Sequence, residues 1–210
     1  MPWKRCLYSV ENQIEPNEPE IAIDASFSKE RAKKYHLVGP LYAFSTAVFY
    51  SRDRYPKGPF AKSANRVITT ISDMRDFSIC GLLGWNYESY YKKHNIPQSV
   101  KIDQTPAGMQ AVFSMVSAKR CDVVEIHPQT VIGAMVTGAL KMPKDIACRK
   151  LVGDLQNFYL MVSRKSPRAK DLVTRLGAAL IHLKSTGKWV TIKDEGVLPT
   201  SGFLDLRKCL

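Results

Sequence analysis

The sequence contains no long hydrophobic segment. No stretch of its 210 residues approaches the roughly 18 consecutive apolar residues that a membrane-spanning helix needs. The start, Met1 to Arg5, has no apolar segment behind its charged residues, so the pattern of a signal peptide is missing. Internal repeats and low-complexity tracts are also absent from the sequence, which argues against collagen and coiled-coil architectures. We therefore expect a globular chain that is not inserted in a membrane.

Cysteine and histidine are scarce and lack the spacing of metal sites. The five cysteines are widely separated, odd in number and include no Cys-x-x-Cys pair: Cys6, Cys80, Cys121, Cys148 and Cys209. This spacing predicts neither a disulfide framework nor a zinc site, and the cysteines in apolar runs are expected to be small buried side chains. The four histidines show no His-x-x-x-His pattern. We expect no metal and no other cofactor.

The composition is that of a folded protein with an excess of positive charge. Hydrophobic residues make up 45% and charged residues 24%, which suits one large domain or two small lobes. There are 31 Lys and Arg against 19 Asp and Glu, a net charge of +12, which favours anionic partners. The basic residues do not form a recognisable nucleic-acid-binding module, so nucleic acid is not expected as a partner.

Short β-rich segments alternate with helical periods, which predicts an α/β fold with parallel or mixed sheets. The expected strands are 21–25, 41–51, 78–83, 121–126 and 158–163. Two helices are expected, because a hydroxyl residue followed by proline is typical of a helix start. They would run from Thr105-Pro106 to about Ala118 and from Ser166-Pro167 to near Gly187.

The segment after the first expected strand is the most suggestive of chemistry. It reads Asp24-Ala25-Ser26-Phe27-Ser28-Lys29-Glu30-Arg31. Ser28 is placed to cap a short helix that has Arg31 in its first turn. A guanidinium beside hydroxyl and free N–H groups suits a bound carboxylate. The alternative is an ordinary capped surface helix with a solvated arginine, and the spacing alone does not separate the two.

Two further segments follow expected strands. Glu125 and His127 lie two residues apart at the C-terminal end of strand 121–126, where open α/β sheets bind ligands. The alternative is a strand-end pair that faces water. Gly84-Trp85-Asn86 follows strand 78–83 but lacks the glycine pattern of a nucleotide-binding loop.

Several segments together resemble the bacterial extracellular solute-binding proteins of family 3, the periplasmic amino-acid receptors of ABC importers. Residues 24–31 resemble the family's D-A-x-x-(S/T)-x-E-R turn, and Arg120 to Val124 resembles its G-R-x-D-A strand. Weaker matches are the helix start at 2–7, the x-P-x-Y motif at 39–42, the return strand at 158–167 and the closing Trp189.

The resemblance implies a periplasmic-binding-protein-like II fold, with two mixed-sheet α/β lobes joined by two hinge strands. Lobe two would contain residues 47–157, and lobe one would combine 1–46 with 158–210. Lobe one would lack the N-terminal strand, helix and strand of the family.

The resemblance also implies a ligand-binding site and no catalytic residues. Arg31 takes the position of the arginine that grips the ligand's carboxylate, preceded by Asp24, Ser26 and the capping Ser28. The loop of lobe two falls on Gly84, Trp85 and Asn86.

The acid that binds the α-ammonium group in the family falls nearest His127, with Glu125 two residues earlier. If Glu125 takes this role, amino-acid recognition is kept. If His127 acts alone, another small carboxylate becomes the expected ligand.

The expected function is that of a monomeric periplasmic protein that captures a polar amino acid or related small carboxylate between its lobes. The partner would be the permease of an ABC importer. One alternative is an enzyme similar to cyclohexadienyl dehydratase, with Glu125 or His127 as general acid. The other is a degenerate or sensory domain that binds a partner protein without a ligand.

Overall fold

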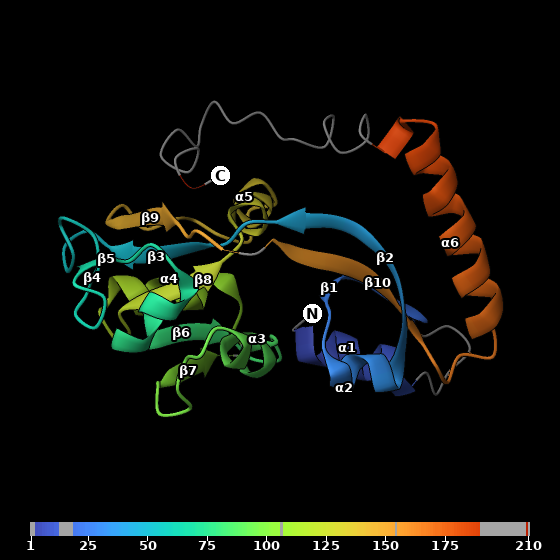
Figure 1. Ribbon diagram of the computed structural model, residues 1–210, viewed down its shortest axis with the longest axis horizontal. Helices are drawn as coiled ribbons and strands as arrows, with labels where there is room; N and C mark the ends of the chain where they lie inside the picture. Colours follow the sequence, from blue (N-terminus) through green and yellow to red (C-terminus); the bar gives the residue numbers. More distant parts are fainter. Residues whose placement is uncertain (1–2, 13–18, 106, 154, 190–208, 210) are drawn as a thin grey trace. The chain divides into compact units, whose positions relative to one another are not determined.

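The structure is a computed structural model that describes residues 3–12, 19–105, 107–153, 155–189 and 209. The chain forms two compact units, which are described separately (Figure 1). Of the described residues, unit 1 contains 3–12, 19–43 and 156–189, and unit 2 contains 44–105, 107–153, 155 and 209. The chain therefore passes from unit 1 into unit 2 and back again.

Unit 1 is built on a three-stranded sheet with the order β1-β10-β2. Its strands are β1 (Ile21–Ser26), β10 (Gln156–Ser163) and β2 (Tyr35–Phe44), and β1 runs antiparallel to β10. Side chains alternate between the two faces of a strand. Met161 accordingly packs in a cluster with helix α1 (Trp3–Asn12), whereas Val162 packs in a cluster with helix α6 (Ala169–Ser185). One helix therefore covers each face of this sheet.

Unit 2 is built on a five-stranded mixed sheet with the order β7-β6-β8-β3-β9. In chain order the strands are β3 (Ala47–Ser51), β6 (Ile79–Leu82), β7 (Ile102–Thr105), β8 (Val123–Ile126) and β9 (Ile146–Lys150). Strand β6 is parallel to β7 and β8, whereas β3 is antiparallel to β8 and β9. The mixed sheet agrees with the α/β class expected from the sequence.

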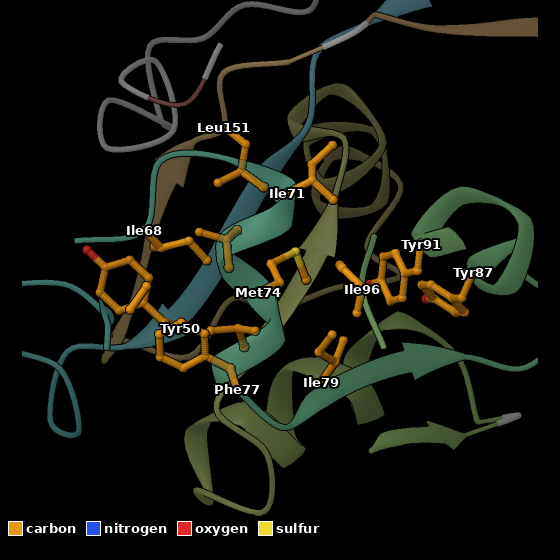
Figure 2. Packing of buried hydrophobic residues seen from close by; sticks show 13 residues of the cluster. Tyr50, Ile68, Ile71, Met74, Phe77, Ile79, Tyr87, Tyr91, Ile96 and Leu151 are labelled. Atoms are coloured by element: carbon orange, nitrogen blue, oxygen red, sulfur yellow. The ribbon is translucent and has the colours of Figure 1, made fainter. Parts of the chain in front are cut away.

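Both faces of this sheet are covered. Helix α4 (Met109–Ser117) packs on one face, where the ring of Phe113 meets that of Phe49 edge-on at 5.4 Å. The other face carries the main core cluster, which includes residues of the 3-10 helix η1 (Ile71–Asp76) and of helix α3 (Tyr87–Lys93) (Figure 2). The remaining elements are α2 (Lys29–Lys34), β4 (Phe60–Ala61), β5 (Arg66–Val67) and α5 (Pro128–Val136).

The two expected helices begin later than predicted: α4 begins three residues after Pro106, and α6 begins two residues after Pro167. Thr105 does not cap a helix but ends strand β7, where it pairs with Leu82, and its hydroxyl accepts a bond from Ala107 N–H. Helix α4 begins only at Met109; Pro106 lies outside the described residues. Ser166 precedes the first residue of α6 by three positions, and its hydroxyl accepts from Arg168 N–H in the turn before the helix.

The expected single strand 41–51 is two strands. β2 ends at Phe44 and pairs within the sheet of unit 1, whereas β3 begins at Ala47 and pairs within the sheet of unit 2. The break at residues 45 and 46 follows because the chain changes sheets there.

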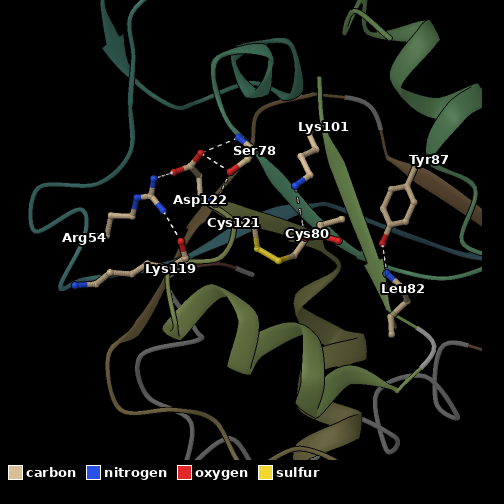
Figure 3. Close-up of a disulfide and its surroundings, with 10 residues drawn as sticks. Arg54, Ser78, Cys80, Leu82, Tyr87, Lys101, Lys119, Cys121 and Asp122 are labelled. Carbon is tan, nitrogen blue, oxygen red and sulfur yellow. Dashed lines mark hydrogen bonds and ion pairs between the residues drawn. A yellow bond between two sulfur atoms is a disulfide. The ribbon is translucent and has the colours of Figure 1, made fainter. Parts of the chain in front are cut away.

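The expectation that the cysteines are unpaired is wrong. Cys80 of β6 is bonded to Cys121, as Figure 3 shows. Cys148 of β9 is bonded to Cys209, and the Cα–Cα distances of the two bonds, 5.7 and 6.1 Å, are in the normal range. Cys80 and Cys121 are 41 residues apart in sequence and meet because β6 and β8 are neighbours. Cys6 keeps a free thiol. Cys209, which belongs to a segment expected in lobe one, is thus tied to unit 2.

The carboxylate of Asp122 is held beside the first disulfide (Figure 3). It accepts a bond from Ser78 N–H at 2.7 Å and forms an ion pair with Arg54 at 2.6 Å. Burial alone would raise the pKa of Asp122, but hydrogen bonds from Ser78 and Tyr55 and the charge of Arg54 hold it below its ordinary value. The aspartate of the R-x-D motif therefore serves the fold.

Asp73 at the start of η1 gives a pH-dependent contribution to stability. Its carboxylate accepts from Thr69 and Thr70 N–H, both at 2.9 Å, and pairs with Arg66. Burial would raise its pKa, but these groups lower it to about 2. A carboxyl group whose pKa is lowered by folding contributes stability that is fully present above its unfolded pKa of about 3.9. This contribution is lost as the pH falls through the folded pKa of about 2.

We expect Asp73→Asn to lower the free energy of unfolding by about 1.5–3 kcal/mol at pH 7, because hydrogen bonds to a charged group are lost. The difference from wild type should shrink between pH 4 and pH 2.5. Urea unfolding at pH 7, 4 and 2.5 measures this, with the exposed Asp53→Asn as control. A difference that stays constant with pH would contradict the role of the Asp73 charge.

Candidate functional site

The turn after β1 is shaped by a bulge in the strand. The pairing of β1 with β10 is irregular between Ala22 and Ala25, and Asp24 adopts a positive φ of 63° there. Aspartate tolerates this conformation better than most residues. The exposed Asp24 carboxylate accepts a hydrogen bond from the Tyr42 hydroxyl of β2. Burial and this bond raise the pKa of Tyr42, so that it remains a donor.

Ser28 has the capping role that the sequence predicts. Its hydroxyl accepts a hydrogen bond from Arg31 N–H at 3.1 Å, and its side chain is buried. Because the hydroxyl is used by the helix, Ser28 contributes to the turn by fixing the position of Arg31.

The Arg31 side chain folds back onto the end of β1. Its Nη1 donates to both the carbonyl oxygen and the hydroxyl of Ser26, each at 2.9 Å. Burial lowers the pKa of Arg31, but a guanidinium with an ordinary pKa above 12 stays charged at neutral pH. Ser26 therefore orients a half-buried positive charge, which is the arrangement that suits a carboxylate ligand. This differs from the solvated arginine of the alternative interpretation.

The second expected group lies in unit 2, in the loop between β6 and α3. Gly84 has a φ of 90°, which favours glycine in this turn. The indole of Trp85 stacks on the ring of Tyr87, with centroids 6.2 Å apart and planes inclined by 25°. Asn86 lies at the N-cap position of α3, and its side chain makes no capping bond to the helix. The loop thus presents an aromatic and an amide side chain.

Glu125 is buried in the sheet of unit 2. It lies in β8 and is 5% exposed, and within the described part of the chain its carboxyl group has no hydrogen-bond or ion-pair partner. Burial raises its pKa to about 8. Glu125 is therefore protonated over much of the neutral range.

His127 follows β8 at the N-cap position of α5 and is 6% exposed. Its Nδ1 lies 3.0 Å from the carbonyl oxygen of Ser45, and its ring centroid is 6.1 Å from that of Phe44. A carbonyl oxygen only accepts, so this contact places a proton on Nδ1. Because Glu125 and His127 are both buried, they are not the water-facing pair of the alternative interpretation.

Two tyrosines contact candidate residues in ways that the sequence does not indicate: Tyr42 contacts Asp24 in unit 1, and Tyr87 contacts the loop after β6 in unit 2. Tyr42 belongs to the x-P-x-Y motif, but nothing in the motif indicates its contact with Asp24. The Tyr87 hydroxyl accepts from Leu82 N–H at 2.9 Å and fastens the loop after β6. Both contacts depend on the fold and have no signal in the spacing.

We expect the stability of a Glu125→Gln variant to exceed that of wild type increasingly as the pH rises from 5 to 8.5. A carboxyl group whose pKa is raised by folding contributes stability that is fully present below its unfolded pKa of about 4.3. This contribution is lost as the pH rises toward the folded pKa of about 8. The change is at most about 1.4 kcal/mol per pH unit. Urea unfolding measures it, with the exposed Glu30→Gln as control. Parallel curves for wild type and variant would show that Glu125 is ionised when folded.

The sheets of the two units and the path of the chain between them define the fold. Two α/β units, each around its own sheet and joined where the chain passes out and back, form the periplasmic-binding-protein-like fold that the sequence resemblance implies. No protein-family model matches the sequence, and no curated protein matches it by sequence.

Solved structures with this fold include the substrate binding protein of an amino acid ABC transporter, with a TM-score of 0.66 and 18% identity over 95% of this chain and 78% of that one. An ancestral arginine-binding protein bound to arginine gives 0.68 and 14%, over 94% and 78%. A histidine kinase sensor domain with similarity to periplasmic binding proteins gives 0.68 and 14%, over 94% and 76%. At these identities the similarity establishes the fold.

Proposed function

We propose that this protein binds a polar amino acid or a related small carboxylate outside the cytoplasm and delivers it to the permease of an ABC importer. The observation that carries the proposal is the half-buried Arg31 guanidinium, which Ser26 holds in place directly after β1. Two of the structural neighbours are amino-acid-binding proteins by description, which supports the ligand class.

Five of the candidate residues have a proposed part in binding. Arg31 forms a charge-assisted pair with the ligand's carboxylate, and Ser26 fixes its direction. Asp24, an exposed carboxylate on the same turn, supplies a negative group for an α-ammonium. In unit 2, the loop of Trp85 and Asn86 is proposed to supply apolar and amide contacts.

The disulfides support the proposed location. Structural disulfides persist in oxidising compartments such as the periplasm and are rare in the cytosol. The bonds Cys80–Cys121 and Cys148–Cys209 leave Cys6 as the one free cysteine of the chain. Among the described helices, none combines the length and the apolar character needed to cross a membrane. The described residues also include no group of three or more potential metal ligands.

A thermal-shift panel of the common amino acids and small carboxylates tests the proposal. A ligand at 100 times its dissociation constant adds about 2.7 kcal/mol of stability. For a chain of this size this raises the melting temperature by about 5–11 °C. A shift with amino acids but not with the matching acids that lack the ammonium group would support the role of Asp24. A cooperative melt with no shift across the panel would contradict solute binding.

A sensory domain is a second candidate, because one structural neighbour is a histidine kinase sensor domain. In this case the chain would bind a partner protein, with or without a small ligand. A cooperative melt without any ligand shift favours this candidate. A shift accompanied by ligand-dependent retention on membranes containing the cognate permease favours the transport role.

An enzymatic alternative rests on Glu125. A buried carboxyl group with a pKa of about 8 is protonated at neutral pH, as a general acid must be. Cyclic dienyl acids incubated with the protein would be dehydrated if this alternative held. Absence of product in the presence of measurable binding would remove it.

A further inference from the structure

Unit 2 contains a pocket formed by its own residues. Its volume is about 700 Å³, and it is formed by helix α3, the segment that follows this helix and strand β7. Pockets that bind small molecules have volumes of about 300–1,000 Å³. The pocket is therefore large enough for an organic ligand of ten or more heavy atoms, and none of its lining residues belongs to unit 1.

One wall of the pocket is aromatic and rigid. Tyr87 and Tyr91 are only 4% and 3% exposed, and they belong to the core cluster together with the buried Ile96 (Figure 2). Trp85 stacks on Tyr87 and extends this wall. Because the tyrosine rings are almost wholly buried, they support the partly exposed ring of Trp85, on which a second ring can stack.

Strand β7 also lines the pocket. Ile102 and Gln104 line the pocket, whereas Asp103 between them does not, as expected from the alternation of side chains along a strand. The strand thus contributes one aliphatic and one amide side chain and keeps its carboxylate away. Strand β7 is an edge strand of the sheet and pairs with β6.

The charge of the lining selects the ligand. Among the described residues that line the pocket, Lys92 is the one that carries a charge. It is exposed on α3. An aromatic wall beside a cation suits a ring that carries a negative group.

We propose that this pocket of unit 2 binds a small aromatic carboxylate, with the ring against Trp85 and the carboxylate at Lys92. The proposal does not depend on Arg31, which belongs to unit 1. It gives Trp85 a second role, since this residue belongs both to the loop after β6 and to the wall of the pocket.

Phenylacetate is a suitable probe, with acetate and 2-phenylethanol as probes that lack the ring or the charge. Ligand-detected NMR titration of the full chain should show binding of phenylacetate in preference to both. Lys92→Ala should weaken it about fivefold, the upper range for an exposed ion pair, and the neighbouring Lys93→Ala should leave it unchanged. Gln104→Trp should abolish binding by filling the pocket, and both Lys92 and Gln104 are exposed, so the variants should fold.

Arg31→Ala separates this site from that of the proposed transport ligand, and it should not affect phenylacetate. Loss of phenylacetate binding in Arg31→Ala, with retention in Gln104→Trp, would overturn the proposal. Equal affinities of the Lys92→Ala and Lys93→Ala variants would overturn the role of Lys92. Absence of phenylacetate binding to wild type in the millimolar range would overturn the site itself.

Discussion

Replacing Arg31 by alanine is expected to weaken binding of the transported solute by about 30-fold or more. Truncating one partner of a buried charge-assisted pair costs about 2–5 kcal/mol, and 1.4 kcal/mol corresponds to a factor of ten. The guanidinium is half-buried and oriented by two bonds to Ser26, so water replaces it poorly. Isothermal titration with the best ligand of the thermal-shift panel measures the effect.

Two variants serve as comparisons for Arg31→Ala. Lys33→Ala removes an exposed positive charge from the same helix and should bind as wild type does. Arg31→Lys keeps the charge but loses the planar fork that pairs with a carboxylate, so its affinity should lie between the two. Equal losses of affinity in Lys33→Ala and Arg31→Ala would show that the effect comes from the net positive charge and not from a specific pair with Arg31. An unchanged affinity in Arg31→Ala would remove the site from the β1–α2 turn.

Local sequence signals predicted the parts of the fold that depend on neighbours in the chain. Ser28 caps α2 as expected, because a capping hydroxyl acts three residues away from its own position. The start of α4 was wrong although it rested on a similar signal. The backbone of Thr105 is used by the pairing of β7 with β6, and this tertiary pairing prevails over the local preference for a helix start.

In the candidate site, too, features that depend on neighbours in the chain could be predicted, whereas features that depend on tertiary contacts could not. The position of Arg31 beside Ser26 could be expected from the strand-to-helix turn, since the two residues are five apart. The raised pKa of Glu125 could not, because the acid is surrounded by a core assembled from strands and helices far apart in sequence. Its i, i+2 spacing with His127 indicated a shared face but not burial. Spacing describes direction along a strand, whereas burial depends on what covers the sheet.

The disulfide between Cys80 and Cys121 is expected to be a main source of stability in unit 2. Opening a loop of 41 residues corresponds to about 4 kcal/mol in the chain-entropy description, within the usual range of about 2–5 kcal/mol for native disulfides. Both cysteines are buried, at 0% and 1% exposure, so the bond is protected from reductants in the folded state. A Cys80→Ala, Cys121→Ala variant should therefore melt roughly 8–16 °C below wild type.

Cys6→Ala is the matched control, since it removes a free cysteine of unit 1 and should leave the melting temperature nearly unchanged. A Cys148→Ala, Cys209→Ala variant keeps only the Cys80–Cys121 bond, so its reduction in denaturant, followed by removal of denaturant under reducing conditions, should lower its melting temperature by a similar amount. This comparison separates the covalent bond from the loss of two buried sulfur atoms.

Because β6 and β8 both lead into loops of the candidate site, the Cys80→Ala, Cys121→Ala double variant should also bind the solute less tightly at temperatures near its melting point. Equal melting temperatures for wild type and the double variant would show that the bond does not stabilise the protein. The proposed oxidising location would then lose the support it takes from Cys80 and Cys121.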